Sequence, residues 1–176
     1  MMEKRYKMDI SGIKLPRALE VEGNGAAIRQ VLFARTVQLW PDSDLSIPMI
    51  AISDPLKRAL RKASLNGSIQ WGLESITGKL EGERKGIDHL RKVKGLMSGE
   101  RVSRLLLVSN DGAERFYRRI EGLFRLHAPR LLCCMLDKDA ITMGNIITGK
   151  EKQIKAVMAD HKDTVSEILR TFLATK

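Results

Sequence analysis

The sequence predicts a mainly α-helical fold with one or two short strands, and three observations lead to that prediction. Apolar residues recur at helical spacing along much of the chain, above all between residues 69 and 97. Helix-starting and helix-ending residues stand at the borders of these stretches, as Pro55 and Ser98-Gly99 do. The segment 101–109 (RVSRLLLVS) is the best candidate for a strand, because it is short and rich in Val and Leu.

We divide the chain into an N-terminal helical region with a basic arm, residues 1–66, and a second region, residues 67–176, which can also form one domain with the first. Residues 1–10 contain three cations and are expected to form a loose arm. A helix is expected over residues 26–39, and a short extended stretch over residues 47–52.

A dense positive face is expected on the next helix, PLKRALRKASL, residues 55–65. Its apolar residues form one stripe, and the remaining positions include Lys57, Arg58, Arg61 and Lys62, with no acid among them. Such a face is either a solvated surface or a set of phosphate contacts.

The segment from Ile69 to Met97 has the clearest pattern in the chain. Apolar residues alternate at steps of four and three, which is a heptad seam. We expect one long amphipathic helix or a helical hairpin here. Several glycines lie off the seam and weaken the helix in isolation. The helix therefore needs a partner, either the rest of the chain or a second copy in a homodimer.

The strand at residues 101–109 is a candidate for reading double-stranded DNA. Arg101 and Ser103 share one face of this strand, Arg104 lies on the other, and Arg115 follows on the next helix. Paired with its twin in a dimer, such a strand would form a possible ribbon-helix-helix-like unit and present side chains to the major groove. The alternative is an ordinary core strand in a mixed domain, which the row Leu105-Leu106-Leu107 favours.

Three stretches resemble a family of proteins encoded by conjugative plasmids and integrating conjugative elements. They are the motif Trp71-x-Leu73-x-x-Ile76-x-x-x-Leu80, residues 102–109, and LLCCMLDKDAI at residues 131–141. The family includes a transcriptional activator of transfer genes on IncC-type plasmids. The resemblance implies a dimeric DNA-binding device and an activator role in conjugative transfer.

A net charge of +10 and an isoelectric point near 9.9 favour a polyanionic partner. No apolar run approaches the ~20 residues that a membrane span needs, and the polar N-terminus has no signal-peptide core. We therefore expect a cytoplasmic protein with no membrane partner. The adjacent Cys133 and Cys134 are expected to be buried thiols in a reducing compartment.

The motifs of common catalytic and nucleotide-binding sites do not occur in the sequence. The three histidines are scattered, and Asp137 and Asp139 would point to different faces of a helix, so that they could not chelate a metal together. We expect no catalytic residue, no metal, no cofactor and no small-molecule substrate, and hence not an enzyme.

These observations lead to one functional hypothesis and two alternatives. The hypothesis is a dimeric, DNA-binding transcriptional regulator with the seven candidate basic residues and Ser103 as its nucleic-acid contacts. The first alternative is an RNA-binding protein like the kink-turn-binding ribosomal proteins, and the second is a non-enzymatic adaptor of a transfer apparatus. The deciding feature is Leu131–Leu136: a helix there favours DNA, whereas a strand favours RNA.

Overall fold

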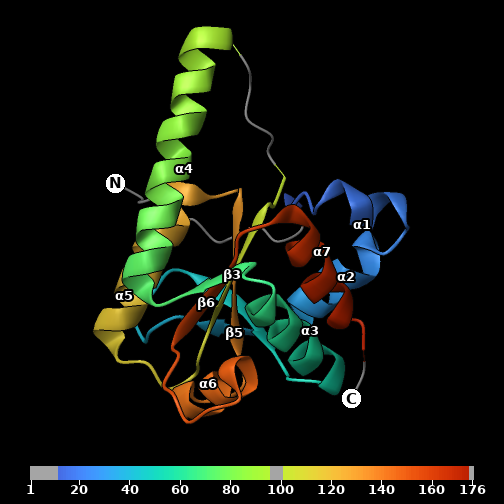
Figure 1. The fold of residues 1–176 in the computed structure, drawn as a ribbon, viewed down its shortest axis with the longest axis vertical. Coiled ribbons are helices and arrows are strands. Elements are labelled where there is room, and N and C mark those ends of the chain that lie inside the picture. Colours follow the sequence, from blue (N-terminus) through green and yellow to red (C-terminus); the bar gives the residue numbers. More distant parts are fainter. Residues whose placement is uncertain (1–11, 96–100, 175–176) are drawn as a thin grey trace.

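The chain folds into a three-layer α/β structure around one mixed sheet of six strands, in the order β1-β2-β5-β4-β6-β3. The computed structural model describes residues 12–95 and 101–174. Helices α4 and α5 cover one face of the sheet, and α1, α2, α3 and α7 cover the other (Figure 1). The prediction of a mainly α-helical fold with one or two short strands is therefore wrong.

The strands are β1 (Thr36–Gln38), β2 (Ser46–Ile50), β3 (Ile69–Trp71), β4 (Arg104–Val108), β5 (Leu131–Leu136) and β6 (Ala156–Ala159). The helices are α1 (Arg17–Val21), α2 (Gly25–Ala34), α3 (Asp54–Leu65), α4 (Leu73–Lys94), α5 (Glu114–His127), α6 (Ala140–Thr148) and α7 (Lys162–Thr171). Strands β2, β5 and β4 run parallel, whereas β6 is antiparallel to β4. Strand β2 pairs with β5, so residues from both predicted regions share one sheet.

The apolar spacing of the sequence also predicts a helix over residues 130–147, but the first part of that stretch is strand β5 and only the second part is a helix, α6. All six residues of β5 are buried, and alternate side chains enter the two cores: Leu132, Cys134 and Leu136 on one face, Leu131, Cys133 and Met135 on the other. A parallel strand covered on both faces needs apolar residues at every position, so its sequence carries no alternation. A continuous apolar run of this length is ambiguous between helix and strand.

Strand β4 is central in the sheet, and this overturns the ribbon-helix-helix interpretation. Residues Leu105–Val108 are at most 1% exposed, and β4 pairs with β5 on one side and with β6 on the other. A groove-reading ribbon needs a free face and a free edge for its twin. Residues 105–108 have neither, because helical layers cover both faces and β5 and β6 pair with both edges.

Helix α3 forms as the sequence predicts. The Ser53 hydroxyl accepts a hydrogen bond from the Leu56 amide at 3.2 Å, and Pro55 lies in the first turn, where it costs no hydrogen bond. The helix expected over residues 26–39 ends earlier, at Ala34, because residues 36–38 form the edge strand β1.

Helix α4 contains most of the predicted heptad seam and continues without a break. Its first half packs on the sheet through the buried Ile76 and Leu80, whereas Leu90 and Val93 are 42% and 63% exposed. The second half projects beyond the body of the protein (Figure 1). The last seam residue, Met97, lies outside the described residues. No helix within residues 12–95 and 101–174 combines the length and the apolar character needed to cross a bilayer.

Cys133 and Cys134 are buried, unpaired thiols, as expected. Burial raises the pKa of the Cys133 thiol to about 12, and burial together with the neighbouring Cys133 raises the pKa of Cys134. Both side chains therefore remain protonated and act as small apolar residues of the core.

Gly144 provides a test of how α6 is packed. A Cβ added to Gly144 would overlap the backbone carbonyl of Lys152, which crosses the helix at this point. We expect Gly144→Ala to lower the free energy of unfolding by about 3 kcal/mol, because backbone must move to accept the methyl group. Gly122→Ala in α5 is the matched control: no heavy atom lies within 4 Å of its added Cβ. That variant should be neutral or more stable by up to about 1 kcal/mol. Equal stability of the two variants in urea denaturation would contradict this packing.

Candidate nucleic-acid interface

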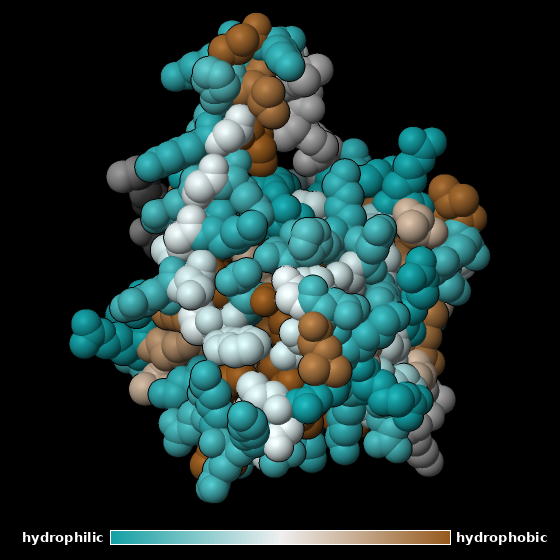
Figure 2. All heavy atoms as spheres, viewed as in Figure 1, coloured by the Kyte–Doolittle hydropathy of each residue, from teal (hydrophilic) through white to brown (hydrophobic). Residues whose placement is uncertain are grey.

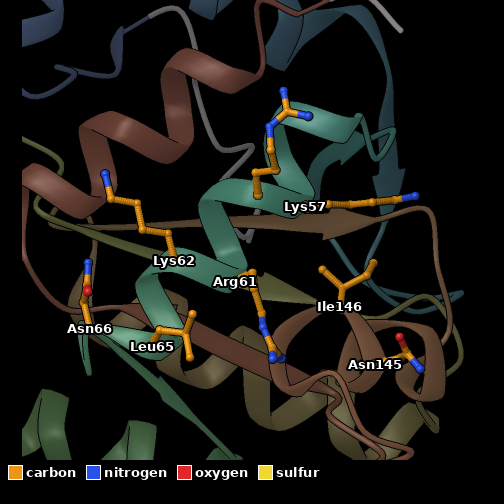
Figure 3. A pocket seen from close by; sticks show the side chains of 8 residues that line it. Lys57, Arg61, Lys62, Leu65, Asn66, Asn145 and Ile146 are labelled. Carbon is orange, nitrogen blue, oxygen red and sulfur yellow. The ribbon is translucent and has the colours of Figure 1, made fainter.

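A basic groove lies between α3 and α6. The apolar stripe of α3 is buried against the sheet, which directs its cations outward. The groove has a volume of about 620 Å³ and is lined by Lys57, Arg58, Arg61, Lys62, Leu65, Asn66, Asn145 and Ile146. Figure 3 shows Arg61 pointing from α3 toward α6, the helix that carries Asn145 and Ile146. We call this surface the α3–α6 groove.

The four cations of α3 differ in how far their charge is balanced. Lys62 forms an ion pair with Glu167 of α7 at 2.9 Å, and Lys57 lies 3.8 Å from Asp54. Arg58 has no ion-pair partner among the described residues. The run without acids in the sequence therefore overstates the unbalanced charge, because folding brings Glu167 beside Lys62.

Arg61 also connects α3 to the end of α6. Its Nη1 donates a hydrogen bond to the carbonyl oxygen of Ile147 at 3.3 Å. Gly149, with a φ of +72°, ends α6 in the left-handed conformation, and a Cβ there would meet the Arg61 guanidinium. A cation at a helix C-terminus interacts favourably with the helix dipole. Arg61 therefore stabilises the groove as well as lining it.

A second basic cavity lies where β4 and β5 begin, between α1, α4 and α7. Its volume is about 630 Å³. The cations that line it are Lys14, Arg17, Arg101, Arg104, Arg130 and Lys162. Strands β4 and β5 are parallel, so Arg104 and Arg130 lie together at the same end of the sheet, where both strands begin. Strand β6 runs the opposite way and ends there, which brings the start of α7, with Lys162 and Ser166, to the same end of the sheet. We call this cavity the arginine pocket.

Glu83 of α4 holds two of these arginines in place. Its carboxylate accepts hydrogen bonds from Arg104 Nε and Nη2 at 2.9–3.1 Å and from Arg130 Nη2 at 3.0 Å. All three side chains are 15–18% exposed. Burial raises the pKa of Glu83, but the hydrogen bonds and charges of the two arginines outweigh that effect and leave the pKa below its ordinary value. The single negative charge of Glu83 thus pairs with two guanidinium groups, so that this cluster of three side chains keeps one positive charge.

The arginine pocket brings together three of the predicted contact residues, Arg101, Ser103 and Arg104, although no ribbon holds them. Arg115 lies elsewhere, exposed on α5 in the opposite helical layer. The remaining cations of the pocket were not predicted from the sequence: Lys14, Arg17, Arg130 and Lys162. One signal was available for Arg130, because it directly precedes a buried strand, as Ser103 precedes β4.

Three carboxylates lie near the carboxyl ends of the parallel strands. Asp111 Oδ1 accepts a hydrogen bond from the Ala140 amide at 3.0 Å, and Asp139 caps α6 through the Thr142 amide at 2.7 Å. Asp137 pairs with Arg35 at 3.4 Å. Within the described parts of the chain, His, Cys, Asp and Glu side chains form no group of three placed to hold a metal ion. These carboxylates are engaged in a turn, a helix cap and an ion pair.

Comparisons with known proteins add little to this geometry. Neither a protein-family model nor a curated protein matches the chain. Among solved structures, the chain is similar to a protein with unknown function from Bacillus halodurans C, with a TM-score of 0.47 and 11% identity. That similarity covers 69% of this chain and 98% of the other.

The Glu83 cluster predicts a pH-dependent stability. We expect Glu83→Gln to lower the free energy of unfolding at neutral pH by about 3 kcal/mol, because Arg104 and Arg130 lose their shared counterion. A lowered pKa means that this contribution is present above the ordinary value of 4.5 and is lost as the pH falls below it. The two proteins should therefore converge in stability well below pH 4.5.

Glu81→Gln, an exposed change of the same charge on the same helix, is the control and should alter stability by less than about 0.5 kcal/mol. Urea denaturation across the pH range measures both variants. A Glu83→Gln protein as stable as the Glu81→Gln protein at neutral pH would show that the cluster contributes nothing.

Proposed function

We propose that this protein is an RNA-binding protein, not an enzyme, and that the α3–α6 groove contacts the RNA. The observation that carries the proposal is the composition of that groove: four cations surround a hollow that also contains two amides and two apolar side chains. Cations bind phosphates, whereas amide and apolar groups bind bases.

The groove offers both kinds of contact that unpaired RNA needs. Leu65 is 73% exposed and, with Ile146, supplies an apolar surface beside the amides of Asn66 and Asn145. Sequence-specific RNA recognition takes place mostly at unpaired bases, whose faces and Watson–Crick edges are open. The hollow is shallow and open to solvent, so a base could lie against it without being enclosed.

The path of the chain also favours RNA over the DNA-reading ribbon. Leu131–Leu136 is a strand, which gives the order strand, helix, strand, helix, strand from β4 to β6. This is the order that the RNA alternative requires. Strand β4 cannot enter a DNA groove, since it is enclosed between β5 and β6. A cytoplasmic location, where RNA and reduced cysteines coexist, belongs to this proposal.

A second candidate function, binding of duplex DNA, rests on the projecting half of α4. A helix about 10–12 Å wide fits a major groove about 12 Å wide. The last turn of α4 carries Arg91, Lys92 and Lys94, and the helix stands clear of the body (Figure 1). The resemblance to conjugative-element activators is a prediction that depends on this candidate.

The groove cations predict a change in the salt dependence of binding. We expect Lys57→Gln/Arg58→Gln to weaken binding to an RNA hairpin with an internal loop. The slope of log K against log salt should fall by about 0.7–0.9 for each phosphate that the variant no longer neutralises. Fluorescence anisotropy between about 50 and 200 mM salt measures that slope.

Arg115→Gln/Arg119→Gln is the control, because it removes the same charge from exposed positions of α5 in the opposite layer. It should leave the slope nearly unchanged. Equal effects of the two double variants would mean that overall charge, and not the α3–α6 groove, attracts RNA. A DNA duplex of equal length bound more tightly than the hairpin would favour the second candidate.

The predicted homodimer depends on the apolar residues that α4 leaves uncovered. Figure 2 shows hydrophobic side chains at the projecting end of α4, where Leu90 and Val93 are exposed. We expect sedimentation velocity at micromolar concentration to show a dimer, and Leu90→Ser/Val93→Ser to shift it to monomer. A wild-type protein that sediments only as the 19.8 kDa species would contradict the prediction.

A further inference from the structure

The arginine pocket is distinct from the α3–α6 groove, and its lining has an excess of positive charge. Among the described residues that line it, the cations outnumber the one acid, Asp163, and Glu83 pairs with Arg104 and Arg130. Arg17 and Lys162 are exposed and have no ion-pair partner among the described residues. A cavity with this excess of positive charge binds anions, and a dianion more strongly than a monoanion.

Several hydrogen-bond donors in the pocket are held in place without being used. Arg130 is fixed by bonds from Nε to the Ser103 hydroxyl at 3.1 Å and from Nη2 to Glu83, which leaves Nη1 without a partner in the described chain. Arg101 is fixed through Nη1, which donates to the carbonyl oxygen of Leu15 at 3.0 Å. These bonds orient the guanidinium groups in advance, so that little side-chain entropy is lost when a ligand binds.

The first turn of α7 supplies a further set of donors. No side chain caps this ten-residue helix, so the amides of its first turn lack the partner that a cap provides. Ser166 lines the pocket, is only 4% exposed, and its hydroxyl has no hydrogen-bond partner among residues 12–95 and 101–174. Helix N-terminal amides commonly bind phosphate groups, and the Ser166 hydroxyl is a further donor in the same lining.

Part of the pocket lining is apolar. Ile87 of α4, Pro16 and Val102 line it together with the cations. A bare inorganic anion would leave these side chains unused, whereas a phosphate attached to a nucleoside would place its ribose or base against them. The volume of about 630 Å³ is within the range of small-ligand pockets.

We propose that the arginine pocket binds a phosphate monoester joined to a nucleoside, supplied by the 5′ end of an RNA strand or by a free nucleoside monophosphate. A monoester carries about −1.5 to −2 charges near pH 7, and a backbone diester carries one. The RNA source rests on the proposed function of the α3–α6 groove, whereas the free-nucleotide source does not.

The test compares one RNA of about 12 nucleotides with and without a 5′ phosphate, together with uridine 5′-monophosphate, in binding to the full chain. If the RNA end is the source, the phosphorylated RNA should bind about ten-fold more tightly, a difference of about 1.4 kcal/mol. If a free nucleotide is the source, uridine 5′-monophosphate should bind in calorimetry and the two RNAs should bind alike.

The wild-type protein should show either a preference for the 5′-phosphorylated RNA or binding of uridine 5′-monophosphate. Arg17→Gln/Lys162→Gln should abolish that preference or binding, and Ser166→Ala should reduce it. The first variant removes exposed side chains that form no ion pair within the described chain, and thermal unfolding checks that its fold is intact. Arg115→Gln/Arg119→Gln removes the same charge from the opposite layer and should change neither effect.

The outcomes separate this inference from the proposed function. Equal affinity for the two RNAs together with no binding of uridine 5′-monophosphate overturns the inference, even if both RNAs bind through the α3–α6 groove. If neither RNA binds, but uridine 5′-monophosphate still binds and its binding requires Arg17 and Lys162, the proposed function is overturned and the inference is supported. A loss of the effect in the α5 control equal to that in the pocket variant also overturns the inference.

Discussion

The pairing of β4 between β5 and β6 is the constraint on which the rest of the structure depends. Leu105 pairs with Leu132 of β5 in parallel and with Ala159 of β6 in antiparallel orientation. The parallel pairing places the first residues of β4 and β5 at the same end of the sheet. The antiparallel pair adds the end of β6, and with it the start of α7. A different orientation of β6 would move Lys162 and Ser166 to the far end of the molecule.

The same topology places the arginine pocket at the amino ends of the parallel strands. In open α/β sheets, ligands generally bind at the carboxyl ends of the strands. Here that end carries Asp111, Asp137 and Asp139, all engaged in caps, turns or ion pairs. The amino end carries the arginine pocket instead. The proposed phosphate site therefore lies at the end of the sheet that such folds use less often.

The amphipathic helices were predictable from the sequence, whereas the central strands were not. Helices α3 and α5 each bury one stripe and expose the other, so periodicity and start signals identify them. Strand β5 has no polar face, because both of its faces are covered, and an apolar run of that length also suits a helix. Its correct assignment requires knowledge of its neighbour β4, which is distant in the chain: Leu131 pairs with Arg104.

The candidate site was predictable in part. Arg101, Ser103 and Arg104 do lie together at a basic surface, but they line a cavity because β4 is a core strand. Arg17 and Lys162 could not be found by inspection of local charge, since each is brought beside Arg101 only by the fold. The cations of α3 were recognised as a group, yet the pairing of Lys62 with Glu167 depends on tertiary packing.

The proposed function places RNA in the α3–α6 groove, and not on α5. Photocrosslinking of a 4-thiouridine-substituted RNA hairpin, followed by mass spectrometry of the crosslinked peptides, tests it most directly. We expect crosslinks at Leu65–Asn66 and Asn145–Ile146 in the α3–α6 groove. Crosslinks concentrated on the exposed face of α5, around Arg115 and Arg119, with none in the groove, would contradict the claim.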